Sequence, residues 1–217
     1  MTLVVKICGL STPDTLDVAL EAGADMVGFV FFPPSPRNIS FDQARLLGER
    51  VRGKARKVAL TVDADDPLLE KIIEALKPDM LQLHGHETPQ RVAAIRESFG
   101  LPVMKALPIE TKSDLTAIQN YTSVADRLLF DARPPREATR PGGLGKPFDW
   151  HLLENLNLSV PFMLSGGLHA GNVAEALAIT RAPGVDVSSG VESAPSVKDV
   201  EKIRAFIRAA RSAKVPA

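Results

Sequence analysis

The sequence predicts a closed (β/α)8 barrel, and three observations support this fold class. Short runs of apolar or β-branched residues occur eight times along the chain, alternating with stretches whose apolar residues recur at helical spacing. Eight such units leave roughly 27 of the 217 residues for each, close to the lower limit of a barrel. A doubly wound open sheet, the alternative for this alternation, usually needs only about five or six strands. We therefore expect one barrel domain over residues 1–217.

The expected strands are short runs of apolar or β-branched residues. They lie at residues 3–7, 26–30, 57–62, 80–83, 102–105, 127–130, 161–164 and 184–187.

Several helices between these strands have a marked start. Thr12-Pro13, Asp66-Pro67 and Thr88-Pro89 each place a capping side chain before a proline at the first helical position. Ser40 and Gln43 have the spacing of a capping box.

The two remaining starts are less marked. A short helix is expected over residues 150–155, and the last helix is expected to begin near Ser196. The apolar residues of that last helix share one face, at Val200, Ile203, Phe206 and Ile207.

Composition excludes several classes of protein. Hydrophobic residues make up 45% of the chain and charged residues 24%, which is typical of a globular protein and not of a disordered one. Lys and Arg number 26, as do Asp and Glu, so no long-range field attracts nucleic acid or an anionic membrane. The single cysteine excludes an intramolecular disulfide and fits a reducing compartment.

Targeting signals are not evident in the sequence. Residues 1–10 lack the pattern of a signal peptide, and the longest apolar stretch, 26–32, is far shorter than the ~18 residues of a membrane span. We expect a cytoplasmic protein with neither a nucleic-acid nor a membrane partner.

Polar or reactive residues stand where the expected strands end, which is where a barrel of this kind carries its chemistry. They are Cys8, Asp63, Gln82, His84, Lys105, Asp131, Ser165, Asp186 and Ser188.

Lys6 and Cys8 share one face of the first strand because side chains alternate along a strand. A nearby ammonium is expected to lower the pKa of the thiol and favour the thiolate. The alternatives are a small buried hydrophobe for Cys8 and, for Lys6, a structural cation paired with Asp63 or Asp131.

Asp131 follows an apolar run, so partial desolvation is expected to raise its pKa and let it hold a proton at neutral pH. A turn or cap residue is the alternative. The loop that follows, 132–148, is long enough to act as a lid or binding loop. It is basic, because it contains Arg133, Arg136 and Arg140.

Two glycine-bearing turns follow the seventh and eighth strands, where this fold often binds phosphate. They contain Gly166, Gly167, Ser188, Ser189 and Gly190.

A metal site is the minor alternative for this end of the barrel. His84 and His86 are spaced as metal ligands can be, and Asp63, Asp131 and Asp186 are the further candidate ligands.

Taken together, these residues resemble the phosphoribosylanthranilate isomerase family. The matching segments are 5–10, 28–31 with 35–37, 81–85, 129–132, 142–145 with 148–150, 165–168 with 172–173, and 187–192. They occur in the family's order over nearly the whole chain.

The resemblance implies a small (β/α)8 barrel that needs no metal or organic cofactor. Its reaction is an Amadori rearrangement of N-(5'-phosphoribosyl)anthranilate to 1-(2-carboxyphenylamino)-1-deoxyribulose 5-phosphate in tryptophan biosynthesis. By this resemblance Cys8 is the general base, Asp131 is the general acid, and Arg37 holds the anthranilate carboxylate. The further substrate-binding residues are Lys6, Gln82, His84, Gly143 and Gly145, and the phosphate cradle is Gly166, Gly167, Ser188, Ser189 and Gly190.

The sequence departs from the family pattern at Leu144 and at 169–171. Other readings stay open: a metal-dependent pentose-phosphate epimerase, a bifunctional isomerase that also serves histidine biosynthesis, and an inactive phosphate-binding module. The expected partner is a small-molecule substrate, and a monomer is favoured over a dimer.

Overall fold

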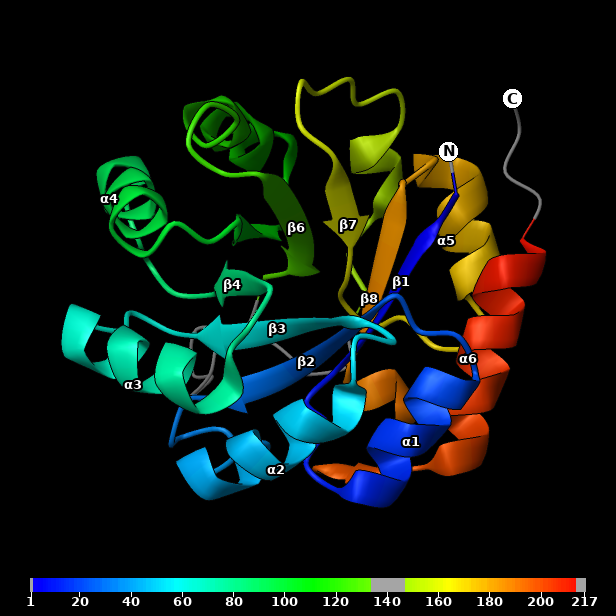
Figure 1. Cartoon of the computed structure of the whole chain (residues 1–217). Helices are drawn as coiled ribbons and strands as arrows, with labels where there is room; N and C mark the ends of the chain where they lie inside the picture. The colour runs from blue at the N-terminus through cyan, green and yellow to red at the C-terminus, as the bar shows by residue number, and fades with distance from the viewer. Residues whose placement is uncertain (1, 134–146, 214–217) are drawn as a thin grey trace.

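Eight parallel strands close into a barrel in the order β1 to β8, with β8 paired to β1 (Figure 1). The structure is a computed structural model that describes residues 2–133 and 147–213. The predicted fold class is confirmed. None of the helices in these two ranges has the length and apolar character of a membrane span.

The strands lie where the apolar runs predict them, with ends that differ by at most two residues in seven of the eight. They are β1 (Val4–Cys8), β2 (Met26–Phe31), β3 (Arg56–Thr61), β4 (Met80–Leu83), β5 (Val103–Ile109), β6 (Arg127–Ala132), β7 (Phe162–Leu164) and β8 (Gly184–Val187). The exception is β5, which continues to Ile109, so Lys105 lies within the strand and not at its end.

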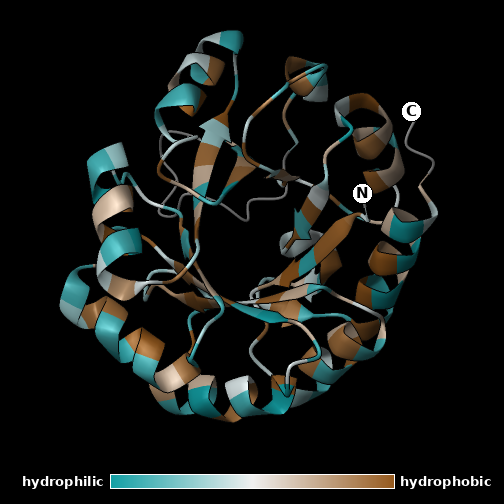
Figure 2. Ribbon diagram, turned by 45° about the horizontal axis from the view of Figure 1, so that its top comes forward, coloured by the Kyte–Doolittle hydropathy of each residue, from teal (hydrophilic) through white to brown (hydrophobic). Residues whose placement is uncertain are grey.

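Helices surround the strands, and apolar residues on them pack against the barrel (Figure 2). The α-helices are α1 (Pro13–Glu21), α2 (Phe41–Val51), α3 (Asp66–Leu76), α4 (Pro89–Phe99), α5 (Val173–Thr180) and α6 (Val200–Ser212). Three 3-10 helices complete the described set: η1 (Lys112–Asn120), η2 (Trp150–Leu153) and η3 (Ser189–Val191).

The predicted helix caps are confirmed at three of four positions. The side chains of Thr12 and Thr88 cap α1 and α4, and Ser40 forms the expected capping box with Gln43. The prediction for Asp66 is wrong by one residue. Asp65 is the cap of α3, and its carboxylate accepts a hydrogen bond from the backbone of Leu68 at 3.0 Å.

The start of the last helix is also corrected. A small antiparallel hairpin, β9 (Glu192–Ala194) and β10 (Val197–Lys198), precedes α6. Ser196 lies in its turn with φ of 66°, and Asp199 caps the helix by accepting hydrogen bonds from the backbones of Glu201 and Lys202. The hairpin matters because it places Glu192 and Lys198 beside the site described below.

The barrel interior is apolar near the N-terminal ends of the strands. This layer is made by Met26, Val58, Met80, Met104, Ala106, Leu129 and Met163, with Val4 packed against it. Because this apolar layer fills one end, the buried polar side chains of the interior are concentrated toward the other.

The corrected cap of α3 gives a test of the fold. Asp65→Ala is expected to lower the free energy of unfolding by about 1 kcal/mol, because it leaves the first turn of the helix without its acceptor. Asp66→Ala is expected to cost less, since it removes a half-exposed ion pair with Arg91. Urea unfolding of the two variants measures the difference, and an equal or larger loss for Asp66→Ala contradicts the assignment.

Candidate active site

Most of the strand-end polar residues are buried at one end of the barrel. Among them, Cys8, Gln82, Asp131 and Asp186 are at most 6% exposed, and so is Lys6, which precedes Cys8 on the same strand face. They come from β1, β4, β6 and β8 and lie above the methionine-rich layer.

Lys6 is paired with Asp186 across the junction of β1 and β8. The two residues are register partners in the ladder, and Lys6 Nζ donates to Asp186 Oδ1 at 2.9 Å. The alternative of a structural cation inside the barrel is therefore right about the ion pair but wrong about its partner, which is neither Asp63 nor Asp131. Although burial alone would lower the pKa of Lys6, the charge of Asp186 raises it above its ordinary value, so the ammonium stays charged.

Cys8 lies beside this ion pair and not in packed hydrocarbon. A Cβ placed on Gly28 would come within 2.8 Å of Cys8 Sγ and 3.1 Å of Lys6 Nζ, so glycine on β2 makes room for both groups. The thiol therefore points into the barrel next to Lys6, on the face that alternation predicts.

The predicted direction of the Cys8 pKa shift is wrong. Burial raises the pKa of the thiol, and the negative charge of Asp186 raises it further. Lys6 lowers it, as expected from sequence, but by less than burial raises it. In the substrate-free protein the ordinary state of Cys8 is the neutral thiol.

The side chain of Asp131 contacts His84, the residue that follows β4. Asp131 Oδ2 lies 3.2 Å from His84 Nε2, while its Oδ1 accepts a hydrogen bond from the backbone of Ala132 at 2.9 Å. Gln82 Nε2 lies 3.0 Å from His84 Nδ1, so a chain of contacts runs from β4 to β6. Three predicted site residues are thus linked by side-chain contacts: Gln82 contacts His84, and His84 contacts Asp131. The protonation of Asp131 stays a prediction.

Two of the predicted strand-end residues do not join this group. Asp63 turns toward the exposed His86, with its Oδ2 3.1 Å from His86 Nδ1. Lys105 alternates with the interior residues of β5 and faces the outside of the barrel, where it pairs with the buried Glu87 at 2.9 Å. The prediction that all the strand ends converge is wrong for these two.

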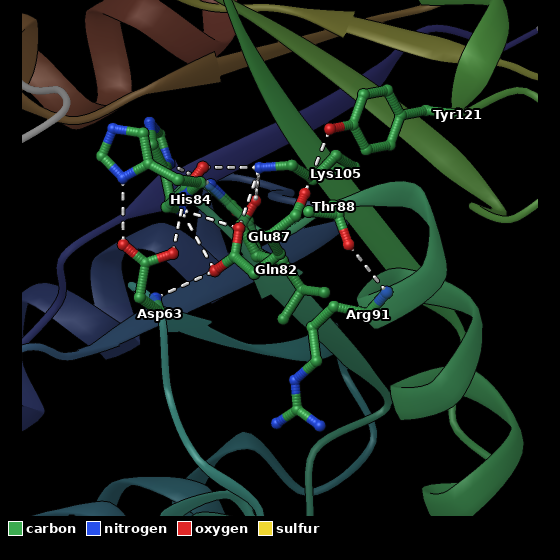
Figure 3. Close-up of polar contacts among 11 residues, drawn as sticks. Asp63, Gln82, His84, Glu87, Thr88, Arg91, Lys105 and Tyr121 are labelled. Carbon is green, nitrogen blue, oxygen red and sulfur yellow. Dashed lines mark hydrogen bonds and ion pairs between the residues drawn. The ribbon is translucent and has the colours of Figure 1, made fainter.

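Glu87 is a buried carboxylate that sequence reasoning missed. It accepts hydrogen bonds from the backbones of Asp63 and Gly85 as well as from Lys105 (Figure 3). Lys105 Nζ also donates to the carbonyls of Leu83 and Gly85, at 3.3 and 2.8 Å. This network fixes the backbone on both sides of His84 and so holds its ring toward Asp131.

The two glycine turns contact each other. Gly166 and Gly167 have φ of 83° and 65°, which favours glycine, and a Cβ on Gly166 would lie 2.6 Å from the backbone nitrogen of Ala132. A Cβ on Gly190 would overlap the carbonyl oxygen of Leu168. The turn after β7 therefore contacts both the turn after β8 and the end of β6, next to Asp131.

Arg37 is buried, with its guanidinium on a carboxylate. It binds Glu192 with two hydrogen bonds, Nε to Oε1 at 2.7 Å and Nη2 to Oε2 at 2.8 Å. Its aliphatic stem lies against the end of β1, since a Cβ on Gly9 would lie 2.6 Å from Arg37 Cδ. Glu192 and its second partner, Lys198, were not singled out from the sequence, because the hairpin that carries them was not predicted.

Two predicted substrate-binding residues, Gly143 and Gly145, lie outside the described residues, as do Leu144, Arg136 and Arg140. The candidate metal ligands do not gather: within 2–133 and 147–213, no three His, Cys, Asp or Glu side chains are grouped as a metal site requires.

Comparisons with known proteins agree on one family. The family model described as N-(5'phosphoribosyl)anthranilate (PRA) isomerase matches residues 5–209. An N-(5'-phosphoribosyl)anthranilate isomerase of Bradyrhizobium diazoefficiens is 68% identical over 212 residues, covering 98% of this chain and 95% of that protein. Another, of Nitrobacter winogradskyi, is 68% identical over 214 residues, covering 99% and 95%.

Solved structures give the same result. The crystal structure of phosphoribosyl anthranilate isomerase from Thermotoga maritima matches with a TM-score of 0.87 and 34% identity, over 97% of this chain and 99% of that one. A phosphoribosyl anthranilate isomerase in complex with reduced 1-(o-carboxyphenylamino)-1-deoxyribulose 5-phosphate matches with a TM-score of 0.83 and 31% identity, with the same coverage.

The environment of Cys8 predicts its titration. Because burial and Asp186 raise the pKa of the thiol, the ultraviolet absorbance of the thiolate is expected to appear only above the ordinary thiol range of about 8–9. Asp186→Asn is expected to lower the pKa, since it removes a negative charge and leaves Lys6 beside the sulfur. Cys8 is the sole cysteine, and the signal is taken as the difference from a Cys8→Ser variant, which cancels the ionisation of Tyr121. Titration at or below the ordinary range contradicts the assignment.

Proposed function

The chain belongs to the phosphoribosylanthranilate isomerase family, and from this premise we propose that it rearranges N-(5'-phosphoribosyl)anthranilate with Cys8 as general base and Asp131 as general acid. The observation that carries the proposal is the placement of these two groups. Both are buried, and both end strands that are separated only by β7 and β8 around the barrel. The reaction is an isomerisation in tryptophan biosynthesis, and it converts an aminoaldose to an aminoketose.

The first step opens the ribose ring. Protonated Asp131 gives its proton to the ring oxygen as the bond from C1 to that oxygen breaks, and the nitrogen lone pair forms a C=N bond. The contact between Asp131 and His84 fixes the carboxyl, so the acid does not have to be ordered when substrate arrives.

The second step removes a proton from C2. Cys8 first loses its own proton to water and then, as the thiolate, takes the proton of C2. The electron pair of the C–H bond forms a C1–C2 double bond, and the C=N electrons return to nitrogen. The resulting enolamine then tautomerises to the ketone. The product of ring opening is a protonated imine, so its positive charge beside the sulfur offsets the burial that raises the pKa of the free thiol.

The two ends of the substrate are anionic, and the described residues offer a binding group for each. Arg37 is the group for the anthranilate carboxylate, because a guanidinium recognises carboxylates through paired hydrogen bonds. The turns containing Gly166, Gly167 and Ser188 to Gly190 are the phosphate site, because glycine permits close approach of backbone N–H groups to an anion. We assign Lys6, Gln82 and His84 to the part of the substrate between these two ends.

Two enzyme alternatives predict different outcomes. A metal-dependent epimerase using His84 and Asp131 loses its activity in a chelator, whereas the proposed isomerase keeps it. A bifunctional isomerase would typically use two aspartates, whereas here a cysteine stands at the end of β1. An inactive phosphate-binding module binds phosphate but shows no turnover. We further propose that the protein is cytoplasmic and consists of one domain. We also propose that it is a monomer, and size-exclusion chromatography tests this state.

The acid and base assignments predict separate losses of rate. Cys8→Ala and Asp131→Asn are each expected to lower kcat by about a thousandfold, because general acid and base groups contribute roughly 10²–10⁴-fold. The measurement is the loss of substrate fluorescence on addition of purified protein. Asp17→Asn on α1, whose carboxylate pairs with Arg50 on the outside of the barrel, is the matched control. Near-full activity of either site variant refutes its role.

The carboxylate assignment predicts a change in binding. Arg37→Lys keeps the charge but loses the planar fork, so KM for the substrate is expected to rise by about tenfold or more while kcat changes less. Competitive inhibition by anthranilate is expected to weaken by a similar factor, and inhibition by ribose 5-phosphate is not. Equal weakening of both inhibitors, or of neither, contradicts the assignment.

A further inference from the structure

Glu192 is a buried carboxylate beside the proposed substrate site, and it accepts four hydrogen bonds. Its Oε1 accepts from Arg37 Nε at 2.7 Å and Lys198 Nζ at 2.8 Å, and its Oε2 accepts from Arg37 Nη2 at 2.8 Å and the backbone of Ser196 at 3.2 Å. The side chain is 5% exposed. Four bonds occupy the acceptor capacity of a carboxylate, so the group is fixed in one orientation.

The hairpin around Glu192 is itself anchored to α6. Lys202 on that helix donates to the carbonyl oxygen of Glu192 at 2.7 Å, and the backbone of Asp199 donates to the carbonyl oxygen of Val191 at 2.8 Å. The left-handed turn at Ser196 brings its N–H back onto the carboxylate. Backbone and side chain of Glu192 are therefore both held by the scaffold.

The second cation on Glu192 leads to the proposed phosphate site. Lys198 Nζ donates to the carbonyl oxygen of Ser188 at 2.8 Å and lies 3.2 Å from its hydroxyl. Its side chain is 1% exposed, so it is a part of the interior and not a surface lysine. Lys198 thus connects Glu192 to the first residue of the turn after β8.

The same carboxylate leads to the other end of the substrate site through Arg37. A Cβ on Gly9 would lie 2.6 Å from Arg37 Cδ and 3.2 Å from Ser188 Oγ, so both residues pack closely against the backbone that follows Cys8. The two anion-binding groups and the base therefore meet around Gly9.

Glu192 is ionised at neutral pH. Burial alone would raise its pKa, but hydrogen bonds and charge from Arg37 and Lys198 lower it to about 2. Burial lowers the pKa of Lys198, and Glu192 opposes that shift. Glu192 and Lys198 thus each favour the charged form of the other.

We propose that Glu192 is a positioning residue that holds the carboxylate-binding Arg37 and the phosphate-binding turn at Ser188 at one fixed separation. The inference rests on the proposed function, which assigns these two elements to the two ends of one substrate. Glu192 does not touch the substrate. Arg37 and the turn at Ser188 are both positioned by the Glu192 carboxylate, so the distance between them is fixed. The site therefore selects ligands whose own carboxylate and phosphate are separated by the same distance.

The test measures binding at the carboxylate site and at the phosphate site separately. Inhibition constants are determined for anthranilate, which has only the carboxylate, and for ribose 5-phosphate, which has only the phosphate, together with KM and kcat for the substrate. Glu192→Gln is expected to raise both inhibition constants and KM by about tenfold while kcat stays within about threefold. Lys198→Met is expected to raise the constant for ribose 5-phosphate and leave that for anthranilate within about twofold.

The matched control is Glu201→Gln, an exposed glutamate on α6 whose nearest cation is Arg204 at 3.8 Å, and it is expected to change none of the constants. A folded Glu192→Gln protein with both inhibition constants unchanged overturns the inference. So does one that loses kcat at unchanged KM, because that pattern indicates a role in the chemical step.

If Glu192→Gln does not fold, the double variant Glu192→Gln/Lys198→Met removes one charge of each sign and is measured instead. Both inhibition constants are again expected to rise, and unchanged constants overturn the inference. Failure of the proposed function has a different signature, since the wild-type protein would then not turn over the substrate.

Discussion

The ion pair between Lys6 and Asp186 is the interaction on which the rest of the site depends. It joins β1 to β8 in register, and β8 has four register partners on β1 but one on β7. The pair therefore helps close the barrel at the point where the chain's first and last barrel strands meet. Because Lys6 is fully buried, removing its partner would leave an isolated charge, which typically costs about 3–5 kcal/mol. Cys8 stands two residues further on the same face, so the pair that closes the barrel also sets the charge around the thiol.

The division of the barrel interior explains why that charge environment matters. Methionines and other apolar residues form a layer of the interior near the N-terminal ends of the strands, so the site rests on apolar side chains. In such surroundings every charge at the other end needs a specific partner, and a thiol without its own cation stays neutral. The raised pKa of Cys8 is thus a consequence of the packing that stabilises the fold. A base of this kind becomes active when the reaction places positive charge beside it.

Sequence patterns predicted the strands and most caps because those depend on neighbours within a few residues. They failed at Asp66 because two successive aspartates precede Pro67 and either has a suitable side chain. They also failed where the deciding partner is distant in the chain. The counter-ion of Lys6 lies 180 residues away, and the pKa of Cys8 depends on burial that no local pattern encodes. Glu192 was missed because strands of three and two residues are too short to show alternation.

The buried cations in and around the site are arranged in two ways, and the difference has a functional meaning. Lys6 and Lys105 each have a carboxylate of their own, Asp186 and Glu87, and each of these pairs stabilises one part of the framework. Arg37 and Lys198 share Glu192. Separate carboxylates would let two binding elements shift independently, whereas a shared one makes their positions interdependent. A ligand with two anionic ends gains from this arrangement, because the separation of its binding groups is set before it arrives and less ordering is needed on binding.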